Sequence, residues 1–175
     1  MLATDPLGAD RLDVALLLLR IFFGLSLAYH GLNKVTGPSG LGGTAGWFGS
    51  IGMRWPRWQA RLAAATEIGA GVLFAAGLLT SVAASGIVGV MFVAIVVAHW
   101  KVGFFVFKPG QGWEYCASIA VTAVAVGTVG AGRWSLDRVL GLQVTGWWGL
   151  SIAAGLGVGA AALQLAVSYR PEASK

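Results

Sequence analysis

Charged residues and cysteine are scarce in this chain of 175 residues. Only 11% of the residues are charged, against 57% that are hydrophobic, and the mean hydropathy of +0.76 is strongly positive. The single cysteine, Cys116, excludes an internal disulfide, a C-x-x-C redox pair and a metal site built from several thiolates. A composition this apolar indicates an integral membrane protein, and we expect Cys116 to be a small core residue.

Long apolar stretches between the few charges predict an all-α membrane bundle. A spanning helix needs about 20 mostly apolar residues. The first expected helix covers residues 12–33, two more divide the tract 62–100 at a turn near 79–85, and the last two cover 114–131 and 147–169. We therefore expect a short N-terminal segment (1–11), a four-helix membrane domain (12–140) with an interfacial connection (35–60), and an additional C-terminal transmembrane helix (145–169). Before that helix, Ser135 and Asp137 are candidate N-caps of a connecting helix.

The basic residues that give the net charge of +5 are distributed as in a membrane topology signal and not as on a nucleic-acid-binding surface. The basic residues lie near the ends of the expected helices and form no stripe with interleaved aromatics. In an up-and-down bundle, one face receives Lys34, Arg54, Arg57, Arg61, Lys101, Lys108, Arg170 and Lys175, and the opposite face receives Arg11, Arg133 and Arg138. The positive-inside rule then predicts a multi-pass membrane protein with its N-terminus outside and its C-terminus in the cytoplasm.

The connection 35–60 begins with glycines and continues with aromatic and large apolar residues. These residues are Trp47, Phe48, Ile51, Met53, Trp55 and Trp58. Aromatic side chains of this kind favour the membrane interface. We predict a short helix around 45–51, either as a simple interfacial anchor or as a partial cap over a binding site.

Arg20 lies inside an otherwise apolar run, residues 14–29. An arginine at mid-bilayer costs about 2.5–3.5 kcal/mol on insertion scales, so we expect it to have a partner. Gly24 and Gly31 share its helix face and allow a second helix to approach closely, while Glu67 lies on a face of small residues. We predict that Arg20 pairs with Glu67 or with Glu114.

Following the chain up and down the bilayer brings several titratable residues toward the basic face, with Arg20 beneath them. The candidate binding residues are therefore Arg20, His30, Lys34, Glu67, His99 and Glu114. This set could form a pocket for a quinone or another lipid-soluble molecule, in which histidine and carboxylate exchange protons. It could equally fix helix register and end helices at the headgroups. No spacing typical of a metal site occurs, and haem held by the two histidines is less favoured.

Six motifs in a fixed order resemble the DoxX family of small bacterial membrane proteins over residues 12–140. They are YHGLNK (29–34), WFGSIGM (47–53), ATEIGAGVLFAAGLLT (65–80), HWKVGFF (99–105), GWEY (112–115) and GAGRWSLD (130–137). The resemblance implies a four-helix bundle in the bacterial plasma membrane that is associated with redox systems. Some relatives are named as subunits of quinol oxidase or thiosulfate:quinone oxidoreductase.

The expected fifth helix departs from the four-helix pattern of that family. Its Gly155 and Gly159 form a small-xxx-small step, which suits close contact with its own bundle or with a partner subunit. The resemblance, together with the cluster of polar residues, thus favours a quinone-linked component or accessory subunit of a membrane oxidoreductase complex, and leaves open whether it catalyses a reaction. The alternative is a noncatalytic scaffold in a larger complex or homo-oligomer; a transporter or lipid-handling protein is less favoured, because no inverted repeat is visible.

Overall fold

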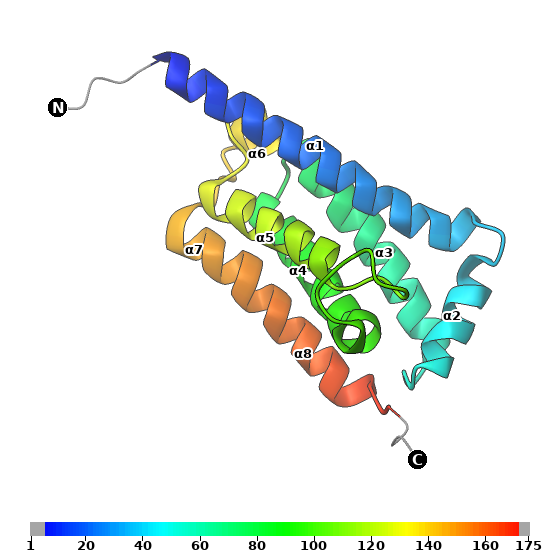
Figure 1. The fold of residues 1–175 in the computed structure, drawn as a ribbon. Coiled ribbons are helices and arrows are strands. Elements are labelled where there is room, and N and C mark those ends of the chain that lie inside the picture. Colours follow the sequence, from blue (N-terminus) through cyan, green and yellow to red (C-terminus); the bar gives the residue numbers. More distant parts are fainter. Residues whose placement is uncertain (1–5, 172–175) are drawn as a thin grey trace.

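The computed structural model describes residues 6–171 as a helical bundle (Figure 1). The longer helices of the first part are α1 (Pro6–Thr36), α3 (Pro56–Ala76), α4 (Thr80–Ala94) and α5 (Glu114–Val129), with the short α2 (Gly40–Ser50) and α6 (Leu136–Leu140) in connections. α4 continues through a π-helical turn, η1 (Ile95–His99), and a 3-10 turn, η2 (Trp100–Val102). The last helix is continuous and comprises α7 (Gly146–Leu150), the π-helical η3 (Ser151–Leu156) and α8 (Gly157–Ser168).

Three helical stretches are long and apolar enough to cross a membrane: Asp10–Thr36, Thr80–Val102 and Gly146–Ser168. α5 is also apolar but shorter, and α3 carries Arg57, Arg61 and Glu67 along its 21 residues. Each span expected from hydropathy is a helix, although the turn expected near 79–85 lies earlier, at residues 77–79, because α4 already begins at Thr80. The prediction of an all-α membrane bundle is confirmed.

α1 and α3 pack closely because their glycines face each other. A Cβ atom on Gly24 would lie 2.6 Å from the carbonyl oxygen of Gly71, and one on Gly71 would lie 2.5 Å from the carbonyl oxygen of Gly24. Further along α1, a Cβ on Gly31 would lie 2.8 Å from the Cβ of Glu67. This contact through small residues is the one the sequence predicts for these two faces.

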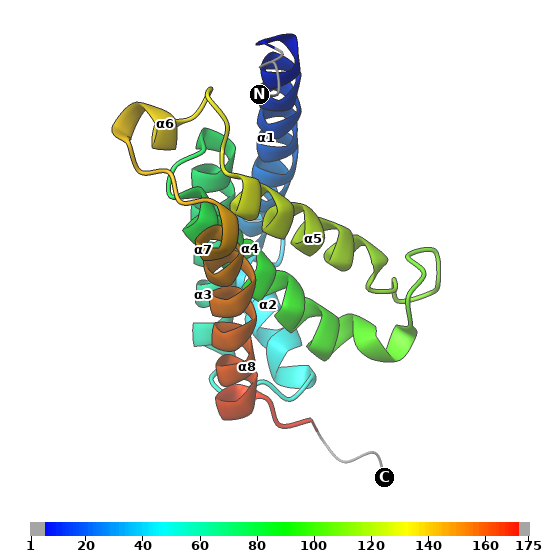
Figure 2. The same cartoon turned by 90° about the vertical axis from the view of Figure 1, so that its left-hand side faces the viewer.

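The centre of the bundle is α4, which packs against α3, α5 and the C-terminal helix. Its buried residues Ala84, Ile87 and Val88 form one apolar core with Phe74 of α3 and Val126 of α5. Figure 2 shows α4 and α5 as a hairpin that diverges from α8 toward the loop 103–113. α4 therefore lies between α3 and α5.

The C-terminal helix belongs to the same bundle. It buries a face at four-residue steps, which includes Ala153, Gly157 and Ala161, and a Cβ on Gly157 would lie 2.7 Å from the carbonyl oxygen of Ser85. Gly155 and Gly159, in contrast, are exposed and have open space where a Cβ would be. The predicted small-xxx-small step therefore does not contact this bundle, because the helix turns Gly157 inward instead.

The end of the C-terminal helix is attached to the connection after α2. Met53 and Tyr169 form an isolated antiparallel bridge. The backbone N–H of Arg54 donates to the carbonyl of Ser168 at 2.7 Å, and that of Arg170 donates to the carbonyl of Gly52 at 2.8 Å. These backbone bonds hold α8 beside α2.

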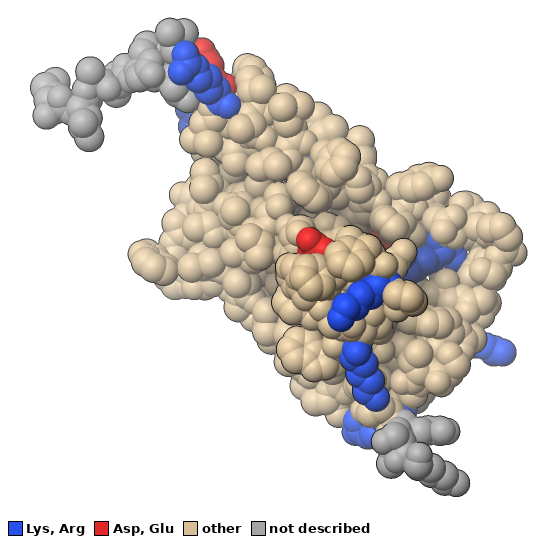
Figure 3. All heavy atoms as spheres, viewed as in Figure 1, with Lys and Arg blue, Asp and Glu red and all other residues tan. Residues whose placement is uncertain are grey.

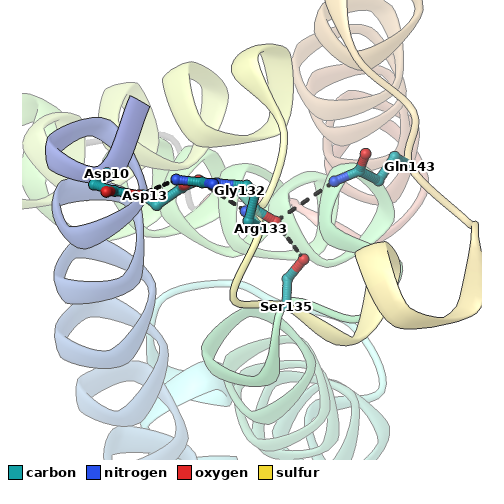
Figure 4. A network of polar contacts seen from close by, with 6 residues as sticks. All are labelled: Asp10, Asp13, Gly132, Arg133, Ser135 and Gln143. Atoms are coloured by element: carbon teal, nitrogen blue, oxygen red, sulfur yellow. Dashed lines mark hydrogen bonds and ion pairs between the residues drawn. The ribbon is translucent and has the colours of Figure 1, made fainter. Parts of the chain in front are cut away.

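A polar network ties the opposite end of the bundle together (Figure 4). The guanidinium group of Arg133 pairs with the carboxylates of Asp10 and Asp13 on α1, and its backbone N–H donates to Asp13 Oδ1 at 2.8 Å. The two carboxylates raise the pKa of Arg133, so this residue stays charged at any physiological pH. Ser135 donates to the carbonyl of Gly132 at 2.6 Å, and its Oγ accepts from the backbone N–H of Arg138. Ser135 is thus the N-cap of α6, as the sequence predicts.

Asp137 caps a different helix from its own. Its carboxylate accepts from the backbone N–H groups of Leu79 at 2.6 Å and Thr80 at 2.9 Å, and from the Thr80 hydroxyl at 2.7 Å. These donors belong to the first turn of α4, which has no side-chain cap of its own. The buried Asp137 therefore joins α6 to α4.

Candidate functional site

Arg20 is completely buried, and backbone carbonyls bind its guanidinium group. Nη2 donates to the carbonyl of Trp134 at 2.7 Å, and Nη1 donates to the carbonyl of Ala75 at 3.4 Å. Nε has no hydrogen-bond partner among the described residues. The predicted ion pair of Arg20 with Glu67 or Glu114 is therefore wrong. The physical reason is that Arg20 lies beside the end of α3, where the Ala75 carbonyl is at the negative end of the helix dipole and the Trp134 carbonyl of a later connection also accepts from it.

Arg20 also lies away from the other candidate residues. It precedes His30 on α1 by ten residues, or about 15 Å along the helix axis. It is not among the residues that line the cavity around His30, so the expectation that it lies beneath the other candidates is a second error.

A cavity of about 870 Å³ lies between α1, α2, α3, α4, α5 and α8, at the end of the bundle that carries α2. Its walls are mainly apolar and include Leu27, Phe48, Met91 and Ile119. Its polar lining residues are Ser26, His30, Lys34, Thr66, Glu67, Ser85, His99, Tyr115, Cys116 and Gln164. A large apolar cavity with a few polar groups is typical of a small-molecule site, for which volumes of about 300–1,000 Å³ are usual.

The first polar pair in the cavity joins α1 to α3. Lys34 Nζ lies 2.6 Å from Glu67 Oε2, and the Glu67 side chain is only 7% exposed. Ser26, His30 and Lys34 all face the cavity because they follow one another at steps of four along α1. The ammonium group has three N–H donors and gives one to Glu67, so it keeps two for a ligand.

The second polar pair joins the end of η1 to the first turn of α5. His99 Nδ1 lies 2.6 Å from the carbonyl oxygen of Gln111, and His99 Nε2 lies 3.0 Å from the Tyr115 hydroxyl. Because a carbonyl oxygen can only accept, Nδ1 carries the proton and the Nε2 of a neutral ring accepts from Tyr115. The π-helical turn that ends at His99 is of a kind frequently found at functional sites.

Four of the six predicted binding residues line the cavity: His30, Lys34, Glu67 and His99. Glu114 does not, because its Oε2 accepts from the backbone N–H of Val106 at 3.1 Å and thereby holds the loop 103–113. Among residues 6–171, no group of three or more His, Cys, Asp and Glu side chains is suited to hold a metal ion.

Tyr115 and Gln164 line the cavity and are absent from the predicted set. The sequence could have indicated Tyr115, because two successive helices that form a hairpin bring the end of the first, with His99, beside the start of the second. Gln164 donates through Nε2 to Gln59 Oε1 at 2.7 Å and so connects α8 to α3. An uncharged amide on a glycine-rich helix gives no comparable signal.

α2 covers one side of the cavity. The predicted short helix around 45–51 is present as Gly40–Ser50. Its Trp47 and Phe48, and Ile51 directly after it, line the cavity. Of the two interpretations of this connection, the contacts favour the cap.

Basic side chains gather at the same end of the molecule (Figure 3). The described residues of the predicted basic face are Lys34, Arg54, Arg57, Arg61, Lys101, Lys108 and Arg170; Lys175 lies outside the described residues. The polar cavity and the excess of positive charge therefore share one end of the bundle.

The family model DoxX matches residues 15–100, a region that includes Lys34, Glu67 and His99. Over 80 residues the chain is 41% identical to a Bacillus subtilis (strain 168) protein named "Putative oxidoreductase CatD". That match covers 46% of this chain and 52% of the relative, so the chain spans about half the length of the curated protein that it resembles. No solved structure matches the chain.

Proposed function

This chain belongs to the DoxX family through residues 15–100, and we propose that it is a redox-associated membrane protein that binds a quinone or a similar lipid-soluble carbonyl compound. The observation that carries the proposal is the presence of two polar pairs, Lys34–Glu67 and Tyr115–His99, in the walls of one apolar cavity. The printed name of the Bacillus subtilis relative, which describes an oxidoreductase, supports the redox class.

The residues of the cavity fit the two chemical halves of such a ligand. The free N–H groups of Lys34 can donate to a carbonyl oxygen of the head group, and the apolar walls around Met91 and Ile119 can hold a hydrocarbon tail. Glu67 and Tyr115 can exchange protons with hydroxyl groups of a reduced head group. His99 can accept the Tyr115 proton at Nε2 and hold it as an imidazolium, while its Nδ1–H stays bonded to the Gln111 carbonyl.

The location of the cavity suits a ligand that arrives through the bilayer. We propose that the protein lies in the bacterial plasma membrane with its basic end toward the cytoplasm. The polar pairs would then lie near the cytoplasmic headgroups, where protons are available.

Bound-ligand analysis tests this proposal. Protein purified in mild detergent should retain a quinone at about one molecule per chain, detected by mass spectrometry of extracted lipid and by the optical spectrum. Glu67→Gln and His99→Ala should lower the retained or re-bound quinone by about tenfold, because the first removes the charge that pairs with Lys34 and the second removes the hydrogen-bond partner of Tyr115. Glu114→Gln, a matched change outside the cavity, should leave it unchanged.

The proposal fails if added quinone does not bind the wild-type protein, or if Glu67→Gln loses its fold while the folded fraction binds normally. The yield of monodisperse protein in size-exclusion chromatography separates loss of folding from loss of binding.

One observation favours a noncatalytic accessory subunit as the second candidate function. Gly155 and Gly159 face outward on the C-terminal helix and leave space for close approach of another membrane helix. A protein partner that co-purifies in fixed ratio without quinone, and is lost with Gly155→Leu, would support this function in place of the first.

A further inference from the structure

A second groove lies on the other side of α2 and is separate from the cavity. Its volume is about 550 Å³. It is lined by Leu41, Gly42, Ala45, Gly46 and Gly49 of α2 and by Pro56, Arg57 and Arg61 of α3. One wall is thus a helix face poor in side chains, and the other carries two arginines.

The α2 wall is open where most helices would have side chains. A Cβ atom on Gly42 or Gly46 would meet nothing within 4 Å, and one on Gly49 would meet only Pro56 at 3.8 Å. The glycines are therefore not required by contact with another helix of this bundle. They leave a shallow apolar channel along the outside of α2.

The α3 wall concentrates positive charge at a helix N-terminus. Arg57 and Arg61 lie in the first two turns of α3 and Arg54 lies just before it, while the first turn has no acidic residue and no side-chain N-cap. Within residues 6–171, none of the ion pairs involves these three arginines. Cations at the positive end of the helix dipole repel it, and a bound anion would reverse that cost. Local arrangements that break such a rule are expected at functional sites.

Two tryptophans orient arginines beside the groove. The guanidinium carbon of Arg54 lies 4.6 Å from the centre of the Trp55 ring, and that of Arg61 lies 5.1 Å from the centre of the Trp58 ring. A guanidinium stacked in this way keeps the N–H groups at its edge free for bidentate bonds to a phosphate. Both tryptophans are exposed, as is typical of side chains at the headgroup level of a bilayer.

We propose that this groove binds an anionic phospholipid of the membrane, with the phosphate on Arg57 and Arg61 and the adjoining glycerol and acyl carbons along Gly42 and Gly46. The charge of the groove selects an anion, and its apolar glycine wall selects an anion attached to hydrocarbon. The position of α2, which also covers the cavity, makes this lipid a stabiliser of the cap.

A lipid titration tests the site on the full-length protein in a neutral detergent. Short-chain phosphatidylglycerol should raise the apparent melting temperature saturably, whereas phosphatidylcholine and inorganic phosphate should not. Arg57→Gln combined with Arg61→Gln should weaken the phosphatidylglycerol effect by about tenfold or more, because charge-assisted bonds to the phosphate are lost. Lys101→Gln combined with Lys108→Gln removes the same charge from the same end of the molecule and should change the affinity less than twofold.

Gly46→Leu keeps every charge and fills the groove, so it should weaken the same lipid effect. Gly69→Leu is its control, because Gly69 of α3 also has open space but lies outside the groove. This second pair of variants carries the test if the double arginine variant does not fold.

Three results would overturn the proposal. Equal losses in the arginine and lysine variants would indicate a general surface-charge effect, an equal effect of inorganic phosphate would indicate a site for free anions, and an equal effect of phosphatidylcholine would indicate no headgroup recognition.

Discussion

Arg20 and Lys34 lie on the same helix, but Lys34 binds a charged acceptor and Arg20 binds neutral ones. Lys34 pairs with the carboxylate of Glu67, whereas Arg20 is held by the carbonyl oxygens of Ala75 and Trp134. Gly77 permits this arrangement, because it has a φ of +64° at the end of α3 and a Cβ there would overlap the Arg20 guanidinium. One cation therefore belongs to the cavity, and the other fixes the opposite end of the bundle.

Arg20→Met should lower the free energy of unfolding by about 2–4 kcal/mol, because it leaves the Trp134 carbonyl without its donor and changes a completely buried volume. Unfolding in mixed detergent micelles measures the change. Arg138→Met, at an exposed position, should stay within about 0.5 kcal/mol of wild type. Normal stability of Arg20→Met with lost quinone binding would contradict this structural role.

Asp137→Ala should expose the first turn of α4 to local opening. The substitution removes the acceptor of three hydrogen bonds from Leu79 and Thr80, and loss of a helix cap costs about 0.5–2 kcal/mol. Hydrogen exchange of the Leu79 and Thr80 amides should accelerate accordingly. Asp10→Ala, which removes an exposed partner of Arg133, is the comparison and should leave these two amides unchanged.

At the scale of elements, π-helical turns occur in two helices that border the cavity. η1 ends at His99, and η3 ends directly before Gly157, so residues of both turns or next to them line the cavity. A π-helical turn inserts an extra residue and rotates the next part of the helix about its axis. These two turns therefore contribute to the directions of His99 and Gly157.

Gly157 and Gly155 lie on opposite faces of the C-terminal helix, one toward α4 and one outward, and so give a matched test of this arrangement. Gly157→Ala should destabilise the protein by about 1–3 kcal/mol, because its Cβ would lie 2.7 Å from the Ser85 carbonyl oxygen and 2.9 Å from Val88 Cβ. Gly155→Ala should be neutral or stabilising by up to about 1 kcal/mol through helix propensity. Thermal unfolding in detergent compares the two variants, and equal stabilities would mean that η3 does not turn Gly157 toward α4.

Hydropathy and length predicted the helices well, because bilayer thickness constrains apolar length and charge directly. The depth of each polar residue was harder to predict. The register that places Gly31 against Glu67 puts Arg20, three turns earlier, level with Ala75 and beyond reach of that carboxylate. Carbonyl acceptors such as that of Trp134 leave no trace in a sequence, because every residue supplies one.

At the scale of the whole molecule, the polar pairs of the cavity come partly from inside and partly from outside the region that matches the DoxX model. Lys34 and Glu67 lie within residues 15–100, whereas Tyr115 and the wall of α8 lie outside it. The cavity of this protein therefore depends on segments that the family match does not include.

The charge asymmetry predicts the orientation of the bundle, and the single native cysteine makes it measurable. Cys116 is fully buried, so an engineered cysteine can report without background. In intact cells, a membrane-impermeant maleimide should label Gln143→Cys and should label Lys108→Cys only after the cells are opened, because the positive-inside rule places the loop 103–113 in the cytoplasm. The reverse labelling would show the opposite orientation.

The bond between Arg20 and Trp134 also has a consequence for how the protein is made. The two residues are 114 positions apart, so at about 5–20 residues per second the ribosome needs about 6–23 s to supply the acceptor after it has made the donor. Throughout that interval α1 carries a cation without its final partner. We therefore expect nascent α1 to remain beside the insertion machinery until the segment around Trp134 has been synthesised. Arg20 would then delay the release of α1 into the bilayer as well as stabilise the finished bundle.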